Sequence, residues 1–131
     1  MPPILNKAPV TIGTTKYEIK DGIVYVERLA RIQHTIENFK KMIAQRLEYT
    51  EGHSYPVIIF GQDMISMDKD SRGYLTNEGS KSTLSRAFVV DKKQGRLQLN
   101  FFIQIYSQPI PTQIFESLEP AVEWSKQFRQ P

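Results

Sequence analysis

The sequence predicts a single α/β domain over residues 1–131, with a core at about 15–129, in which helices pack against a mixed sheet of four to five strands. Three observations predict it: an Asp-Gly pair between two β-forming runs, a stripe of apolar residues with helical spacing, and a continuous apolar run after that helix. A run of this last kind is typical of a strand buried on both faces. A chain of 131 residues is long enough for one core and too short for two.

The first predicted element is an N-terminal hairpin. Tyr17–Lys20 and Ile23–Val26 are rich in β-forming residues, and Asp21-Gly22 joins them. Glycine accepts the positive φ that a two-residue turn needs, so Asp-Gly between such runs is a strong hairpin signal.

A helix and a buried strand follow the hairpin. Thr35 can cap the helix, and Gly52 can end it. Its apolar stripe has the spacing i, i+3, i+7 and i+11 and consists of Ile36, Phe39, Ile43 and Leu47. The continuous apolar run Tyr55–Phe60 then predicts a strand at the centre of the sheet.

The second half of the chain continues the alternation. We expect a helix from about Lys69 to Glu78 with Asp68 as its N-cap and Gly79 as its stop, and then a strand at Ala87–Val90. A short strand at Thr112–Phe115 precedes a final helix that Ser117 caps. In that helix the inward stripe is Ala121, Trp124 and Phe128.

The segment from residue 96 to residue 106 gives two conflicting signals. Apolar and polar positions alternate along most of it, and a period of two favours a strand. A strand here would form a hairpin with Ala87–Val90 and interrupt the alternation of strands and helices. Periodicity alone therefore favours a strand, and the order of the elements favours a helix.

Composition and charge indicate a cytoplasmic protein and give little sign of nucleic-acid binding. The net charge is +3 and the pI about 9.2, but the 17 basic residues are spread among 14 acidic ones. Only Lys40-Lys41 and Lys92-Lys93 are adjacent basic pairs, which favours an ordinary solvated surface. The chain has no cysteine, no apolar run long enough to cross a bilayer and no signal-peptide pattern, so we expect neither disulfides nor stable membrane insertion.

Two stretches resemble the STAS domain, the fold of bacterial anti-sigma-factor antagonists of the SpoIIAA type. The first is the apolar strand Val57–Phe60 followed by Met67–Leu75, similar to Met-Asp-Ser-Ser-Gly-Leu-Gly-x-Leu. Met67, Asp68, Gly73 and Leu75 match this signature, and the four residues at 69–72 do not. The second is Asn-Phe-Phe at 100–102, Pro-Thr-x-x-Phe at 111–115 and Ala-x-x-Trp at 121–124, which resemble the SpoIIAA-like group labelled STAS/SEC14. The resemblance implies a helix at 96–106, which we adopt.

The resemblance also implies a role in signalling through protein–protein interaction. In regulatory members the second serine of the signature accepts a phosphate at the N-terminus of a helix, and the aligned residue here is Asp70. Aspartate gives that position a permanent single negative charge in place of a switchable one. The implied partner-binding residues are Asp63, Ser66, Asp68, Lys69, Asp70, Ser71 and Arg72.

We expect no catalysis, no cofactor and no metal site. Asp63, Asp68 and Asp70 lack the glycine and glutamate spacing of an EF-hand, and a helix cap with a residue complementing the helix dipole explains the last two. A catalytic constellation would require His34 or His53 beside a serine such as Ser66, Ser71 or Ser85, and no Gly-x-Ser-x-Gly elbow presents one.

The alternative function is binding of a lipid or another small apolar ligand through residues 97–106. A helix in this segment would spread its apolar side chains around the axis, and those that do not enter the core would face solvent or a partner. The candidate ligand-binding residues are Phe101, Phe102, Ile105 and Tyr106. We expect a protein partner that the sequence does not identify, and the sequence leaves open whether the chain forms a homodimer.

Overall fold

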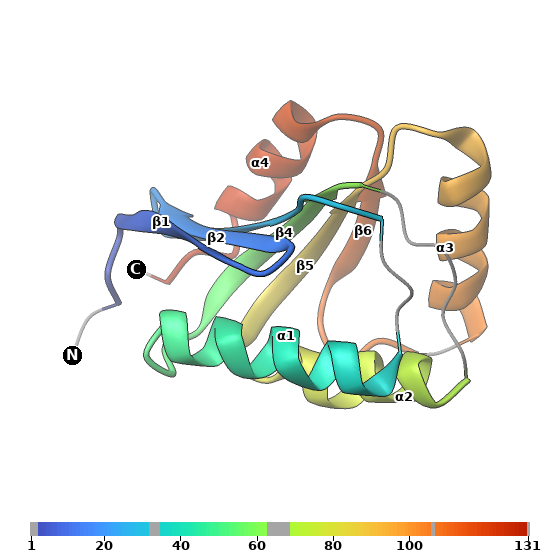
Figure 1. Ribbon diagram of the computed structural model, residues 1–131. Helices are drawn as coiled ribbons and strands as arrows, with labels where there is room; N and C mark the ends of the chain where they lie inside the picture. The colour runs from blue at the N-terminus through green and yellow to red at the C-terminus, as the bar shows by residue number, and fades with distance from the viewer. Residues whose placement is uncertain (1–2, 32–34, 63–68, 106, 131) are drawn as a thin grey trace.

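The computed structural model describes residues 3–31, 35–62, 69–105 and 107–130, and shows a mixed six-stranded sheet with four α-helices (Figure 1). The N-terminal strands are β1 (Lys7–Ile12), β2 (Thr15–Lys20) and β3 (Ile23–Arg28). The alternating part of the chain consists of α1 (Ile36–Tyr49), β4 (Tyr55–Gly61), α2 (Lys69–Asn77), the 3-10 turn η1 (Glu78–Ser80), β5 (Thr83–Val89), α3 (Lys93–Ile105), β6 (Thr112–Phe115) and α4 (Leu118–Lys126).

The strands lie in the sheet in the same order as in the sequence. β1, β2 and β3 are antiparallel, and β3 to β6 are parallel. The sheet has six strands, and the expectation of four to five was wrong because Lys7–Ile12 adds an edge strand to β2. Gly13, with φ +61°, takes part in the turn that joins β1 to β2.

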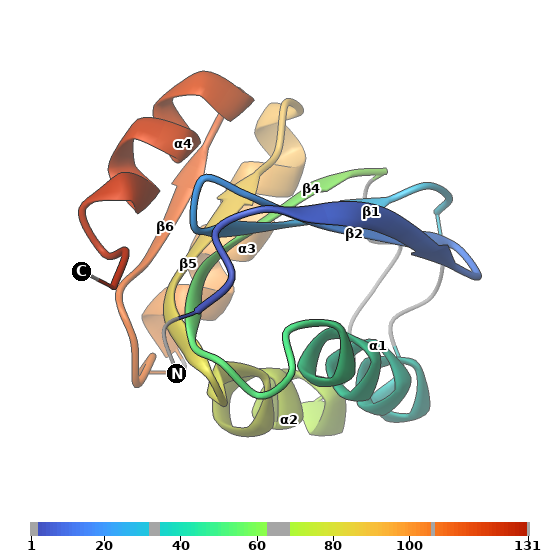
Figure 2. The same ribbon diagram turned by 90° about the vertical axis from the view of Figure 1, so that its left-hand side faces the viewer.

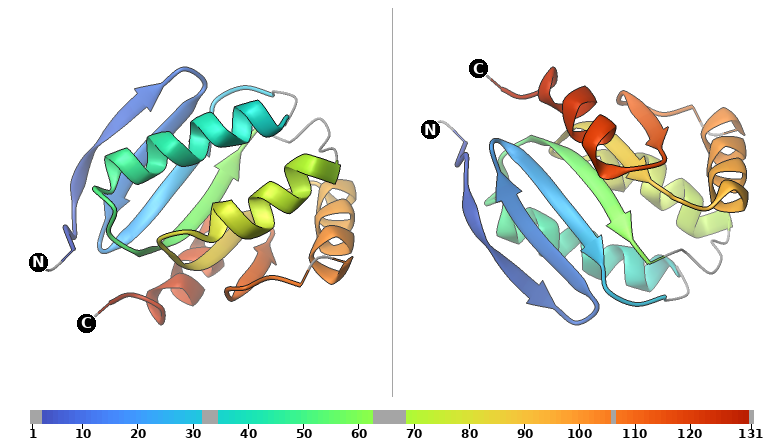
Figure 3. Two further views of the ribbon diagram at one scale, coloured as in Figure 1. Left: turned by 90° about the horizontal axis from the view of Figure 1, so that it is seen from below. Right: turned by 90° about the horizontal axis from the view of Figure 1, so that it is seen from above.

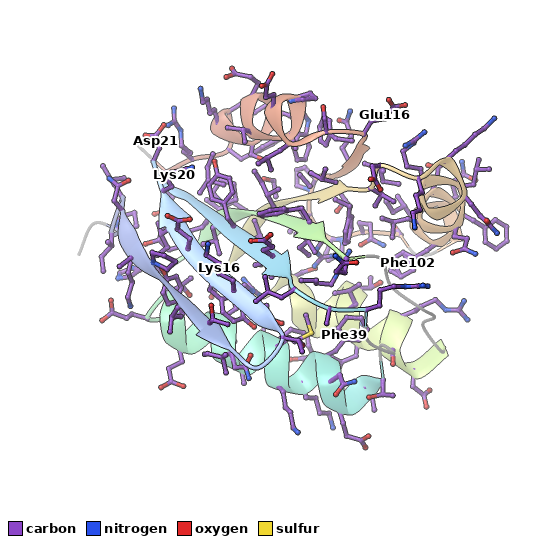
Figure 4. The ribbon with its side chains drawn as sticks, turned by 45° about the horizontal axis from the view of Figure 1, so that its top comes forward. Lys16, Lys20, Asp21, Phe39, Phe102 and Glu116 are labelled. Carbon is purple, nitrogen blue, oxygen red and sulfur yellow. The ribbon has the colours of Figure 1, made fainter. Side chains whose placement is uncertain are left out.

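The predicted hairpin is confirmed. Lys20 pairs with Ile23, and the two residues between them both have positive φ, 51° at Asp21 and 74° at Gly22. This conformation matches the twist of antiparallel strands. Tyr17 and Ile19 on β2 are buried toward α1, and Lys16 and Lys20 lie on the other face of the sheet (Figure 4).

Helices cover the two faces of the sheet unequally. α1 and α2 lie on one face, α4 lies on the other, and α3 stands at the end of the molecule near β6 (Figures 2 and 3). Thr35 caps α1 as predicted, because its hydroxyl accepts a hydrogen bond from the Asn38 N–H at 3.2 Å. Ser117 stands at the N-cap of α4, where its side chain makes no capping hydrogen bond.

The helical assignment of residues 96–106 is confirmed through residue 105, because α3 spans Lys93–Ile105. The alternating pattern is misleading here because it distributes apolar residues around the helix. Leu99 and Phe102 are buried, whereas Leu97 and Phe101 are exposed. The local period of two favours a strand. In the folded chain the segment is a helix, and Leu99 and Phe102 pack against the core.

The core lies in separate layers on the two sides of the sheet. On the α4 side, buried residues of β3, β4, β5 and α4 form one cluster, made of Ile23, Tyr25, Ile58, Ala87 and Ala121. On the α1 and α2 side, a second cluster joins both helices to β5 and α3 through Phe39, Ile43, Leu75, Phe88, Val90, Leu99 and Phe102. This second cluster holds α2 and α3 against the same core.

Candidate functional site

The candidate site lies where the parallel strands end and α2 and α3 follow them. β4 is bounded by β3 on one side and β5 on the other, so the apolar run Val57–Phe60 is central, as predicted. Parallel strands share one carboxyl edge, and the segments that follow them meet there. In Figures 1 and 3 the start of α2 lies beside α3.

The end of β4 is fixed to the end of β3. Gly61 has φ +104°, and a Cβ at this position would overlap the Arg28 carbonyl oxygen and lie 2.8 Å from the Arg28 nitrogen. The Gln62 N–H donates to the Arg28 carbonyl at 2.9 Å, and Arg28 Nε donates to the Gln62 carbonyl at 2.8 Å. Only glycine permits so close an approach of two backbones. The chain therefore leaves β4 at a position that is fixed relative to the end of β3.

The first turn of α2 distributes its side chains between solvent and interior. Asp70 is exposed, Ser71 is fully buried and Arg72 is half-buried. Ser71 therefore belongs to the interior and cannot contribute its hydroxyl to a surface in this conformation. The predicted partner-binding residues Asp63, Ser66 and Asp68, and the side chain of Lys69, lie outside the described residues.

α3 presents apolar side chains in two directions. Phe101 is 64 % exposed, whereas its neighbour Phe102 is 5 % exposed and belongs to the core. Leu97, one turn before Phe101, is 60 % exposed and was absent from the predicted ligand-binding residues. The helical spacing of four between Leu97 and Phe101 was the signal that could have identified the pair. The side chain of Ile105 and all of Tyr106 lie outside the described part of the chain.

Arg96 joins the start of α3 to the ends of two strands. Its Nη1 donates to the carbonyls of Val90 at 3.0 Å and Asp91 at 2.6 Å, and its Nη2 forms an ion pair with Glu116 at 3.3 Å. Val90 and Asp91 follow β5, and Glu116 follows β6. Because one guanidinium binds both connections, the N-terminal end of α3 is fixed relative to the sheet.

An apolar cavity of about 50 Å³ lies between α1, α2 and the sheet. Three of the residues that line it are buried cationic residues, Arg28, Arg46 and Arg86, and no local sequence pattern predicts that they are inside. Burial lowers the pKa of Arg46 to about 10 and that of Arg86 to about 10. Sites for small molecules typically hold about 300–1,000 Å³, so this cavity is too small for an acyl chain.

The structure separates the described members of the catalytic constellation that we considered. His53 precedes β4, at the amino end of the parallel strands, whereas Ser71 lies in α2, which follows the carboxyl end. Ser85 is fully buried, and His34 and Ser66 lie outside the described residues. Among the residues that the structure describes, no three His, Asp or Glu side chains are close enough together to hold a metal ion.

Comparisons with known proteins give a family and no named relative. No curated protein and no solved structure matches the chain. In the ranges described above, no helix has both the length and the apolar character needed to span a bilayer. A family model, described as a domain of unknown function, matches residues 17–129 and thus begins after β1. The chain belongs to this family, DUF7793.

Proposed function

We propose that the chain is a STAS-like module without chemistry of its own, which docks a cytoplasmic signalling partner at the first turn of α2. The observation that carries the proposal is the position of Asp70, which is exposed in the first turn of α2, the helix that follows the central strand β4. The helix dipole and the free N–H groups at a helix start favour negative charge at this point.

The arrangement of the elements supports the STAS-like part of the proposal. Strands β3 to β6 are parallel and adjacent in chain order, and α1, α2 and α3 connect them in turn. β3 is also the second strand of the hairpin that begins with β2, and α4 ends the chain. From β2 onward, this is the order of elements that the resemblance at 57–75 and 100–124 implies.

Asp70 gives the proposed surface a constant charge. A phosphoserine at this position would carry a charge nearer −2 and could be removed, whereas a carboxylate stays at −1. Ser71 offers no replacement acceptor in this conformation because it is fully buried. The partner is therefore expected to bind without a phosphorylation cycle at this turn.

The test is quantitative affinity capture with the full chain and two substitutions, Asp70→Ser and Asp70→Ala. Glu37→Ala is the matched control, because Glu37 is also an exposed acidic residue in the first turn of a helix, α1. We expect the recovered partner to be depleted about tenfold by both Asp70 substitutions and to be retained by the control. Equal recovery with all the variants would overturn the proposal.

Binding of a lipid in an enclosed site has less support from the geometry. The cavity under α1 and α2 is about 50 Å³, and Phe102 is part of the core. The exposed Phe101 favours contact at the surface. Native mass spectrometry separates the two functions, because a co-purifying lipid would favour the ligand and a clean chain mass would favour the docking module.

A further inference from the structure

α3 presents its outer side to solvent at one end of the molecule. The helix lies beyond the last strand of the sheet, and no helix or strand of the described residues covers its far side in Figures 1 and 3. Lys93, Leu97 and Phe101 follow one another at intervals of four residues and therefore lie along one side of the helix. Leu97 is 60 % exposed and Phe101 is 64 % exposed, more than any other large apolar side chain described, and Leu5 follows at 57 %.

The residues beside this row are amides rather than charged side chains. The exposed neighbours of Leu97 and Phe101 on α3 are Gln94, Gln98, Asn100 and Gln104. Residues 97–115 contain no Asp, Glu, Lys or Arg, in a chain that is 24 % charged. Protein interfaces have centres that are depleted in charge and surrounded by polar groups, and this helix surface has that composition.

We propose that the outer side of α3, from Lys93 to Gln104, binds a second copy of the chain through an antiparallel pair of α3 helices. Leu97 of each copy would lie against Phe101 of the other, with the two-fold axis near residue 99. A two-fold interface must be complementary to itself. Amide side chains meet this requirement because each one both donates and accepts hydrogen bonds.

The charge pattern selects the antiparallel orientation. Lys93 is the only charged residue in the proposed row and lies at one end of it. In an antiparallel pair the two Lys93 side chains lie at opposite ends, whereas a parallel pair would bring like charges together. The proposal does not depend on the function assigned to Asp70.

An anionic membrane surface fits the same side of α3 less well. Helices that bind at such a surface carry Lys and Arg along the polar flanks of the apolar stripe. Here the flanks hold Gln and Asn, and Arg96 is already engaged with Glu116. A second copy is therefore the occupant that the side chains favour.

Sedimentation equilibrium of the full chain over a range of concentrations tests the dimer. We expect Leu97→Lys and Phe101→Lys each to raise the dimer Kd by about 30-fold or more, as the loss of a central interface residue does. Leu29→Lys is the control, because Leu29 is an apolar residue that is 44 % exposed outside α3. Circular dichroism and unfolding midpoints would show that each variant is folded. A chain that stays monomeric at concentrations up to about 1 mM, or an equal loss with Leu29→Lys, would overturn the proposal.

Spin labels test the orientation, and the absence of native cysteine allows single-site labelling. We expect labels at Gln98→Cys to be close together in the dimer and labels at Gln94→Cys to be separated by about 12 Å more along the helix axis. Equal separations at the two sites would overturn the antiparallel pair. Co-sedimentation of a monomeric chain with phosphatidylserine vesicles, lost in Phe101→Lys, would assign this surface to a membrane and overturn the dimer.

Discussion

The guanidinium of Arg46 donates a 2.9 Å hydrogen bond to the Thr83 hydroxyl inside the protein. It also donates to the carbonyls of Gly79 at 3.3 Å and Lys81 at 3.1 Å, and it forms no ion pair within the described residues. Arg46 therefore links α1 to η1 and to the start of β5 by hydrogen bonds alone. A buried cation in such a position depends on complete hydrogen bonding.

Replacement of Arg46 should destabilise the fold, and the loss should be larger when the aliphatic stem is removed together with the guanidinium. Arg46→Ala leaves buried acceptors without their donor, so we expect the free energy of unfolding to fall by about 3 kcal/mol. Arg46→Met keeps most of the aliphatic stem and should cost less. Urea unfolding measures both, with the exposed Arg31→Ala as a control that stays within about 0.5 kcal/mol of the parent. Equal stability of Arg46→Ala and the control would contradict the linking role.

The stabilising effect of the Tyr17 hydroxyl should disappear at high pH. Burial raises the pKa of Tyr17 to about 12, and its hydroxyl lies 3.1 Å from the Met42 carbonyl and 3.0 Å from Gln45 Oε1. The unfolded chain loses this proton near pH 10 and the folded chain keeps it, so the contribution is complete below pH 10 and declines toward pH 12.

The measurement for Tyr17 is a difference between two proteins. Relative to Tyr17→Phe, the parent chain should lose about 1.4 kcal/mol of unfolding free energy between pH 8 and pH 11. The comparison cancels titrations that both proteins share. A difference that stays constant over this range would show that Tyr17 ionises equally in the folded and unfolded chains.

Gly61 should tolerate alanine much less well than Gly13. Both have positive φ, but a Cβ at Gly61 would overlap the backbone of Arg28, whereas a Cβ at Gly13 meets nothing within 4 Å. We expect Gly61→Ala to cost about 3 kcal/mol or more and Gly13→Ala about 1 kcal/mol. Calorimetry of the two variants compares them directly. Similar costs would mean that the junction of β3 and β4 can shift to admit a side chain.

Tyr49 should control the local opening of β1. Its hydroxyl donates to the carbonyl of Ala8 at 2.7 Å or of Lys7 at 3.0 Å, and it accepts a hydrogen bond from the Ile19 N–H at 3.3 Å. Tyr49→Phe removes these bonds, so we expect β1 amides to open with about 1–2 kcal/mol less free energy in hydrogen exchange.

Tyr55→Phe provides the control for this experiment. The Tyr55 hydroxyl donates to the Ile4 carbonyl at 2.8 Å, in the segment that precedes β1. The Tyr55→Phe substitution should leave the protection of the β1 amides against hydrogen exchange unchanged. Equal exchange from β1 in both variants would show that the hydrogen bonds to β2, rather than Tyr49, hold the edge strand.

The sequence predicted those elements whose signal is local. The Asp21-Gly22 turn, the Thr35 cap and the strand Thr112–Phe115 all appear where they were expected. The turn needs positive φ and the cap needs a hydroxyl, and short-range stereochemistry fixes both. The central position of β4 was also predictable, because a continuous apolar strand requires cover on two faces.

Tertiary structure decided the features that depend on contacts between different elements of the chain. β1 is an edge strand held partly by Tyr49, about 40 residues later, so its own sequence carried little signal. Arg46 and Arg86 are inside because hydroxyls and carbonyls of other elements accept their hydrogen bonds. Asp70 faces solvent, while the geometry of α2 turns the adjacent Ser71, which is also polar, toward the interior. A sequence specifies what each residue can bond to, and only the folded chain determines which partners are within reach.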